Sequence, residues 1–409
     1  MNLHDERNKV QRRQFLQGMG IAAVGLAFAP LRSQADTETL AFGNGTRELI
    51  AYPQKRPLML VTARPPHLEM PFAVFKEGVL TPNDAFFVRY HMPNIPASID
   101  AGLHRLKVGG LVDKPLSLSL KDLQGMGDPV EIVAVNQCSG NSRGFVSPRV
   151  FGAQLGNGSM GNARWTGIPL KKVLEQAGVQ AGAKQVTVRG LDHAVLPATP
   201  EFVKAFDIDL ALNGETMIAW AMNGADIPFL NGYPIKLIVP GYFGTYWVKH
   251  LSEIEVIGHD FDGFFMKTAY RVPDNDCQCI PAGSNPDKMR PITQLKIRSF
   301  ITSLRGGESL PLGNPVALQG IAFDSGSGIS AVEISDDGGQ HWQAATLGED
   351  LGKYSFREWR THWKPQSKGK VALQVRARNR LGEEQPASGL WNPGGYAHNA
   401  IETISVFVV

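Results

Sequence analysis

Apolar and polar residues alternate most regularly near the C-terminus of the chain. Between residues 371 and 378, apolar side chains that would face a core alternate with polar ones that would face water: Val371, Leu373, Val375 and Ala377 against Gln374, Arg376 and Arg378. A period of two is typical of a half-buried strand. Similar segments recur at residues 295–302, 316–323, 329–335, 356–363 and 401–409, and Asp336–Gly339 is a hairpin turn. Residues 291–409 are therefore predicted to form an all-β, immunoglobulin-like sandwich.

Residues 36–290 mix strand and helix patterns. Apolar and β-branched runs predict strands at residues 86–91, 104–108, 130–135, 185–189 and 233–240. A helix is predicted over residues 169–177, because Pro169 stands at its start and Gly178 follows its end. Residues 36–80 predict an extended arm rich in proline and charge, and the glycine-dense residues 152–167 predict a loop. The expected fold class is α+β, a mixed α/β domain over residues 36–290 followed by the sandwich.

The first 35 residues differ from the rest of the chain. Arg12-Arg13-Gln14-Phe15-Leu16 precedes a short apolar run from Gly18 to Pro30, and Ser33-Gln34-Ala35 resembles a small-residue cleavage site. This pattern predicts a twin-arginine signal peptide over residues 1–35, which would export an already folded protein, often with its cofactor, to the periplasm. A membrane anchor is the alternative, but the apolar run is short for a span, and no run of spanning length follows.

Removal of residues 1–35 would change the charge balance. They hold five of the 41 Lys and Arg residues and two of the 38 Asp and Glu residues, so the remainder carries 36 of each and is formally neutral. A neutral chain offers no general attraction to nucleic acid, and a nucleic-acid partner is not expected.

Three cysteines are too few for a disulfide framework in an exported chain of 409 residues. Cys277 and Cys279 form a C-x-C in a turn-rich segment and could be free, paired with each other or oxidised. The sequence contains no C-x-x-C-H, so no c-type haem is expected on this chain. Cys138 stands alone in the sequence.

The stretch Val135–Gly144 is the main candidate for chemistry. A β-branched run, Val130–Val135, gives way to small, turn-forming residues, so Cys138 is expected where a strand ends in a loop. A thiolate held there with one side open is a good ligand for a soft metal. Arg143 offers a planar cation suited to a small oxyanion. A buried free cysteine beside a turn is the alternative interpretation.

Two further segments carry polar residues where a ligand could use them. In a strand over residues 86–91, Phe87, Arg89 and His91 share one face, which is either a polar pair for a site or a solvated face. The loop over residues 241–250 is rich in aromatic residues and glycine. It could wrap a flat cofactor, with its amides and Lys249 donating to a phosphate, or form an aromatic corner of the core.

These motifs, in this order, resemble the sulfite oxidase family of molybdenum enzymes. Phe86–His91 is similar to the family's Arg-x-His strand, and Cys138–Arg143 to its Cys-x-Gly-Asn-x-Arg loop. Matching segments follow in order: Gly190–Asp192, Ala221–Gly224, Tyr233-Pro234 and Val248-Lys249. Ser335–Trp342, in the predicted sandwich, resembles part of the family's dimerisation domain. The resemblance extends from Leu58 to Val409.

The resemblance implies a molybdopterin cofactor, with Cys138 as the only protein ligand to molybdenum. It implies oxidation of sulfite to sulfate, with Arg89, Arg143 and Tyr270 in the substrate pocket and His91 contacting the pterin or ordering that pocket. The residues expected to bind the cofactor are His91, Cys138, His193, Lys204, Thr245 and Lys249. Electrons would leave one at a time for an external cytochrome c or a haem subunit, and the sandwich would hold a homodimer.

One position departs from the animal enzymes of the family. Those enzymes carry a tyrosine that reaches substrate immediately before the segment matching Ala221–Gly224, and here that position is Trp220. Tyr270 resembles a tyrosine of bacterial relatives and is expected to take its place.

Four functions compete on the sequence. The first is a periplasmic sulfite dehydrogenase, and the second is a sulfane dehydrogenase subunit of a thiosulfate-oxidising complex. The third is the catalytic subunit of a methionine sulfoxide reductase, and the long sandwich argues against it. The fourth is a secreted binding protein without a redox role, which predicts no molybdenum.

Overall fold

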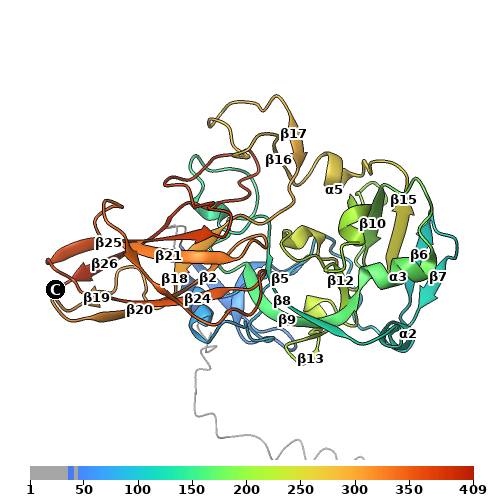
Figure 1. The fold of residues 1–409 in the computed structure, drawn as a ribbon, viewed down its shortest axis with the longest axis horizontal. Helices are drawn as coiled ribbons and strands as arrows, with labels where there is room; N and C mark the ends of the chain where they lie inside the picture. Colours follow the sequence, from blue (N-terminus) through green and yellow to red (C-terminus); the bar gives the residue numbers. More distant parts are fainter. Residues whose placement is uncertain (1–35, 41–44) are drawn as a thin grey trace, which may run out of the picture. The chain divides into compact units, whose positions relative to one another are not determined.

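The computed structural model of the protein describes residues 36–40 and 45–409 (Figure 1). The predicted signal peptide of residues 1–35 lies outside the described residues.

The segment that follows forms a sheet. Five strands lie in the order β1-β2-β3-β4-β5, with antiparallel neighbours: β1 Thr37–Thr39, β2 Thr46–Ile50, β3 Leu58–Thr62, β4 His67–Glu69 and β5 Val88–Arg89. The expectation of an extended arm over residues 36–80 is therefore wrong, because prolines such as Pro53 and Pro65 lie in the turns between strands. The strand expected over residues 86–91 is limited to β5, in which Arg89 pairs with His67.

Most of the α-helices pack against a second sheet. Its order is β11-β10-β15-β6-β7, and its strands are β6 Leu106–Gly110, β7 Leu116–Leu118, β10 Gln185–Arg189, β11 Val203–Asp207 and β15 Glu253–Ile257. The short helices are η1 Phe72–Lys76, α2 Leu120–Gln124, α3 Leu170–Ala177, α4 Ile208–Ala211 and α5 Phe264–Lys267. Helix α3 confirms the predicted helix: Leu170, Val173, Leu174 and Ala177 are buried on one face, and Gly178 ends it in a left-handed conformation.

The third sheet contradicts one prediction. It has the order β13-β12-β9-β8, with β14 also paired to β12: β8 Val130–Gln137, β9 Met160–Pro169, β12 Met217–Met222, β13 Ala225–Asp226 and β14 Lys236–Ile238. Residues 160–167, expected in a loop, belong to β9. Their glycines mark close packing, since a Cβ on Gly161 would lie 2.6 Å from the Phe86 ring and one on Gly167 would lie 2.1 Å from the Ile218 carbonyl oxygen.

Short elements connect these sheets to the C-terminal part: η2 Arg143–Phe145, η3 Phe229–Asn231, η4 Gly244–Tyr246, β16 Arg271–Pro273 and β17 Met289–Pro291. Strands β16 and β17 pair, and the loop between them projects from the molecule (Figure 1). Cys277 and Cys279 lie in this loop and form a disulfide with each other.

The predicted C-terminal sandwich is confirmed. One sheet has the order β18-β20-β24-β23: β18 Arg298–Ile301, β20 Val316–Phe323, β23 Thr346–Leu347 and β24 Arg357–Trp363. The other has the order β19-β26-β25-β21-β22: β19 Ser309–Leu310, β21 Ile329–Ser335, β22 Gln343–Ala344, β25 Gly369–Asn379 and β26 Glu402–Val408. In β25, Leu373, Val375 and Ala377 are buried, as the alternation predicts.

The sandwich is joined to the Cys138 loop through buried contacts. Arg298 in β18 is 1% exposed, donates from Nη1 to Ser142 Oγ at 2.8 Å and pairs with Glu402 in β26. A single apolar cluster contains both Val135 of β8 and Phe300 of β18. The shape of the Cys138 loop therefore depends on residues more than 150 positions further along the chain.

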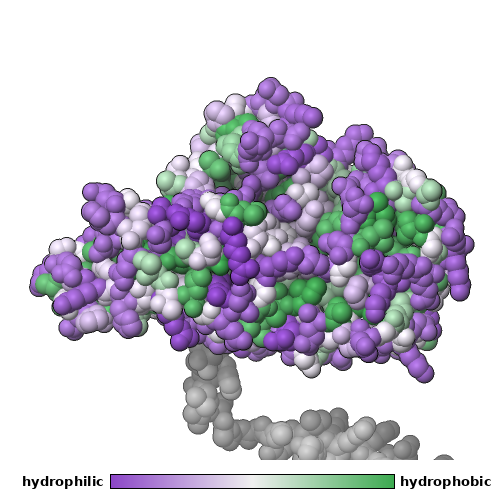
Figure 2. Space-filling view, viewed as in Figure 1, coloured by the Kyte–Doolittle hydropathy of each residue, from purple (hydrophilic) through white to green (hydrophobic). Residues whose placement is uncertain are grey.

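On the face drawn in Figure 2, hydrophilic residues surround smaller hydrophobic areas, one of which lies over β8 and β9. Among the described residues, no helix is long and apolar enough to cross a membrane.

Candidate functional site

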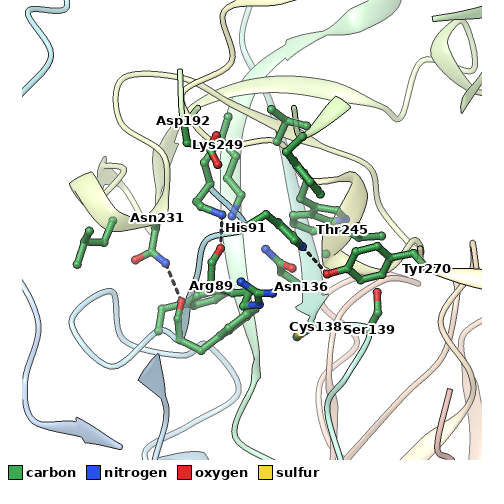
Figure 3. A pocket seen from close by; sticks show the side chains of 18 residues that line it. Arg89, His91, Asn136, Cys138, Ser139, Asp192, Asn231, Thr245, Lys249 and Tyr270 are labelled. Carbon is green, nitrogen blue, oxygen red and sulfur yellow. Dashed lines mark hydrogen bonds between the residues drawn. The ribbon is translucent and has the colours of Figure 1, made fainter. Parts of the chain in front are cut away.

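Cys138 directly follows β8 and lies beside the start of β9. Its backbone N–H donates to the Ser159 carbonyl oxygen at 2.9 Å. Asn141 then turns the chain back, because its N–H donates to the Cys138 carbonyl oxygen at 3.0 Å and its side-chain Oδ1 accepts from the Ser159 N–H at 3.0 Å. The backbone is thus held on both sides of the loop, while the Cys138 thiol is free, half-buried and borders a pocket (Figure 3).

The pocket gathers side chains from distant segments. Six of the predicted site residues line it: Arg89, His91, Cys138, Thr245, Lys249 and Tyr270. In Figure 3 the Arg89 guanidinium, Asn136 and Cys138 lie around one space, with Tyr270 at its side. The convergence of these six residues agrees with the sequence motifs, and their individual roles stay predictions.

Three cations share this pocket with one carboxylate, since Arg89, Lys236, Lys249 and Asp192 all line it. Lys249 Nζ donates to the Arg89 carbonyl oxygen at 2.5 Å. Lys236 is buried, and its Nζ lies 4.7 Å from the centre of the Trp165 ring. A carbonyl oxygen or an aromatic face attracts an ammonium group without neutralising it. The pocket therefore has an excess of positive charge.

Burial makes this excess costly. It lowers the pKa of Lys249 to about 8, although the Asp192 and Cys138 charges act in the opposite direction. It holds the pKa of Lys236 well below 10.5, and the charge of Lys249 adds to that effect. An anionic ligand would stabilise the charged form of both lysines.

His91 and Tyr270 form a hydrogen-bonded pair in the pocket wall. The Tyr270 hydroxyl and His91 Nε2 share a hydrogen bond, and the His91 ring stacks on Phe202 with 3.8 Å between ring centres. Burial, assisted by the charges of Arg89 and Lys249, holds the pKa of His91 well below 6.5. Burial raises the pKa of Tyr270 above its ordinary value of 10. Both side chains are therefore neutral near pH 7.

Several buried polar atoms of lining residues lack a hydrogen-bond partner within the described ranges: Asn136 Oδ1, Ser139 Oγ and Thr245 Oγ1. A buried unpaired polar group costs about 1–3 kcal/mol, so three in one pocket indicate a polar ligand. No group of three or more His, Cys, Asp or Glu side chains in the described part of the chain could hold a metal ion. A metal bound at Cys138 would therefore need ligands other than a cluster of these side chains.

Arg143, which was expected in the substrate site, is not among the residues that line this pocket, and its role in binding substrate stays a prediction. Its Nε donates to the Gly394 carbonyl oxygen at 2.9 Å, and its Nη1 donates to the Ala153 carbonyl oxygen at 3.2 Å. Its guanidinium also lies 5.0 Å from the centre of the Tyr396 ring. The sequence could not show this arrangement, because Gly394 is 251 residues away.

Lys204 and His193 also lie outside the pocket lining. Lys204 is fully buried, donates from Nζ to the Phe265 carbonyl oxygen at 2.7 Å and lies 5.5 Å from the centre of the Tyr270 ring. His193 is half-exposed, with Nδ1 3.5 Å from Glu201 Oε2. A direct contact of either residue with a cofactor stays a prediction.

The lining residues that were given no role from the sequence include Asn136, Asp192, Asn231 and Lys236. Asn136 and Asp192 lie within the motifs that carried the resemblance, so their positions were flagged without a role. Lys236 stands inside an apolar strand, and a charged residue in such a run is a detectable signal for a buried functional group. Trp220 lies half-buried in β12 and does not line the pocket.

Two domain families match the sequence. Residues 91–265 match the oxidoreductase molybdopterin binding domain, and residues 289–408 match the Mo-co oxidoreductase dimerisation domain.

Curated relatives and a solved structure resemble most of the chain. Human mitochondrial sulfite oxidase is 31% identical over 377 residues, covering 87% of this chain and 67% of the relative. Sulfite oxidase of Arabidopsis thaliana is 29% identical over 332 residues, covering 77% and 82%. The crystal structure of the sulfane dehydrogenase SoxCD from Paracoccus pantotrophus superposes with a TM-score of 0.70 and 22% identity, covering 95% of this chain and 92% of that one. The likeness to the SoxCD structure, at 22% identity, shows a shared fold and nothing more.

Buried histidines around the site predict a loss of stability in mild acid. Burial is the largest cause that lowers the pKa of His67 and His91 well below 6.5 and that of His250 to about 3. The unfolded chain binds a proton on each imidazole near pH 6.5, whereas the folded chain does not. The free energy of unfolding should therefore fall by about 1.4 kcal/mol per histidine between pH 7.5 and 5.5.

Urea unfolding at pH 7.5, 6.5 and 5.5 would measure this slope. His250→Asn should flatten it, whereas substitution of the exposed His259 by Asn should leave it unchanged. A slope that is the same in His250→Asn and in the wild-type protein would contradict a neutral His250 in the folded state.

Proposed function

The chain belongs to the sulfite oxidase family of molybdopterin enzymes, and on this premise we propose that it oxidises sulfite to sulfate at a molybdenum centre bound through Cys138. The observation that carries the proposal is the free Cys138 thiol at a pocket that also contains Arg89, Lys236 and Lys249. A thiolate suits a soft metal, and the cations suit an anionic cofactor and substrate. The net reaction converts sulfite and water to sulfate, two protons and two electrons.

The lining residues fit molybdopterin. Asn136, Ser139 and Thr245 present unpaired polar atoms to a flat polar group, and Lys236 and Lys249 provide charge for its phosphate. When bound, the cofactor would supply the molybdenum that transfers oxygen to sulfur and takes up both electrons. The protein would supply position and electrostatics.

Arg89 would bind sulfite. Its guanidinium lies in the pocket near Cys138, while Lys249 holds its backbone carbonyl at 2.5 Å (Figure 3). A guanidinium can donate two parallel hydrogen bonds to one oxyanion, which fixes orientation as well as position. The neutral Tyr270 hydroxyl and His91 could then orient a further substrate oxygen and carry a proton released from the consumed water.

A sulfane dehydrogenase is the second candidate. The Arg143 guanidinium is engaged by the Gly394 and Ala153 carbonyl oxygens instead of lining the pocket. With Arg143 donating to these carbonyl oxygens, fewer hydrogen bonds would be available to a dianion in the pocket, which would suit a less charged sulfur substrate.

We propose further that the enzyme is a periplasmic homodimer that passes electrons singly to a cytochrome c. The match of residues 289–408 to a dimerisation domain supports the dimer. A two-fold contact between identical sandwich surfaces would serve this purpose. The paired arginines and apolar run of residues 1–35 support export by the twin-arginine route.

Replacement of Cys138 by serine should abolish activity without unfolding the protein. The substitution keeps the shape of the side chain but removes the soft thiolate, and a single change of this kind costs about 0.5–3 kcal/mol of stability. Turnover with sulfite should fall to near background, and the sulfur-to-metal charge-transfer absorption should vanish. Cys277→Ser and Cys279→Ser are the controls and should leave both properties nearly intact. A Cys138→Ser protein with full molybdenum, an unchanged spectrum and normal turnover would refute the assignment.

Replacement of Arg89 by methionine should mainly weaken capture of sulfite. A charge-assisted hydrogen bond contributes about 1.5–3 kcal/mol, so kcat/KM should fall about ten- to a hundredfold. Arg164→Met is a matched control, because that arginine pairs with Glu131 on the surface, 3.3 Å away. Steady-state kinetics with sulfite, on variants and wild-type protein of equal molybdenum content, would measure kcat/KM. A wild-type value in Arg89→Met would exclude Arg89 from the anion site.

A further inference from the structure

Tyr270 adopts an unusual backbone conformation. Its φ angle is +59°, in the left-handed region that bulky side chains rarely occupy. Such a conformation persists only when surrounding contacts hold it, and it is most often found at functional sites. The contacts of Tyr270 therefore show what the fold uses to keep its hydroxyl beside His91.

The side chain that braces Tyr270 comes from the C-terminal part of the chain. The Tyr396 ring stacks on the Tyr270 ring, with 5.6 Å between centres and 20° between planes. Burial raises the pKa of Tyr396, and the charge of Arg143 acts in the opposite direction. On the other side of Tyr270, the backbone carbonyl accepts from the Ile292 N–H at 2.8 Å.

Tyr396 also contacts Arg143. The guanidinium carbon of Arg143 lies 5.0 Å from the centre of the Tyr396 ring, a cation–π arrangement. The neighbouring Gly394 carbonyl oxygen accepts from Arg143 Nε at 2.9 Å. One short segment thus holds the two predicted substrate-pocket residues that come from separate parts of the chain, Arg143 and Tyr270.

The segment around Tyr396 is built to hold this ring. A Cβ on Gly394 would lie 2.4 Å from the Tyr396 ring, and one on Gly395 would lie 2.9 Å from Arg143 Cγ. The Asn392 side chain holds both backbone groups of Tyr396: Oδ1 accepts from its N–H at 3.0 Å, and Nδ2 donates to its carbonyl oxygen at 2.8 Å. A side chain at 394 would thus collide with the tyrosine, and one at 395 would collide with Val150 and the arginine.

We propose that Tyr396 is a positioning residue of the active site, through which the C-terminal part of the chain fixes Tyr270 and Arg143 in their working geometry. The proposal rests on the proposed sulfite oxidation. Tyr396 acts through its neighbours and need not touch substrate. Without its ring, Tyr270 relaxes from the left-handed conformation, its hydrogen bond to His91 is lost, and the Arg143 guanidinium gains freedom.

The test compares Tyr396→Leu with Tyr396→Phe in the full-length, molybdenum-loaded protein. Tyr396→Leu should lower kcat/KM for sulfite about tenfold at unchanged molybdenum content. Tyr396→Phe keeps the stacked ring and should retain most of the activity. Tyr354→Leu is the control, because Tyr354 also joins the C-terminal part to the first domain, through Glu215 at 2.7 Å, away from the pocket.

Crystal structures of the same variants give a readout that does not depend on turnover. In Tyr396→Leu, Tyr270 should leave its left-handed conformation and its hydroxyl should move away from His91. Gly394→Ala, which displaces the Tyr396 ring, should reproduce both effects if Tyr396→Leu does not fold. If the wild type does not oxidise sulfite, the proposed function fails while the structures still decide the positioning role. Unchanged Tyr270 geometry and kcat/KM in Tyr396→Leu, or equal losses in Tyr354→Leu, would overturn the proposal.

Discussion

A thiol that must bind a metal has to be held rigidly while its sulfur stays accessible, and the structure around Cys138 meets both requirements. Backbone hydrogen bonds to Ser159 and from Asn141 fix the loop. Ser142 is held in turn by Arg298 of the sandwich at 2.8 Å. The site is therefore a property of the whole described chain, because neither the strand pair β8–β9 nor the sandwich alone completes the loop.

Electrostatics gives the pocket its second defining property. Arg89, Lys236 and Lys249 are gathered with a single lining carboxylate, Asp192, in a place where burial disfavours charge. Such an arrangement is stable when an anion occupies it, and both a phosphate-bearing cofactor and an oxyanion substrate would do so. The neutral His91–Tyr270 pair adds hydrogen-bonding capacity without adding further charge.

The sequence predicted those parts of the structure that depend on local pattern. The strands of the sandwich follow from a period of two, and the position of Cys138 follows from a strand that ends in small residues. Contacts over long separations were not accessible, which is why the hydrogen bond from Arg143 to the Gly394 carbonyl oxygen could not be predicted. Composition alone also pointed to a loop over residues 152–167 and to an extended arm before residue 80. The glycines in β9 instead reflect close packing against Phe86, and the prolines before residue 80 lie in tight turns.

The most direct test of the account is the substrate preference of the protein purified from a host that makes molybdopterin. Molybdenum content would be measured first, followed by reduction of ferricytochrome c with sulfite, thiosulfate or methionine as the electron donor. The account predicts molybdenum in proportion to the chain and rapid reduction with sulfite alone. A protein without molybdenum, or one with molybdenum that reduces cytochrome c with another donor and not with sulfite, would contradict it.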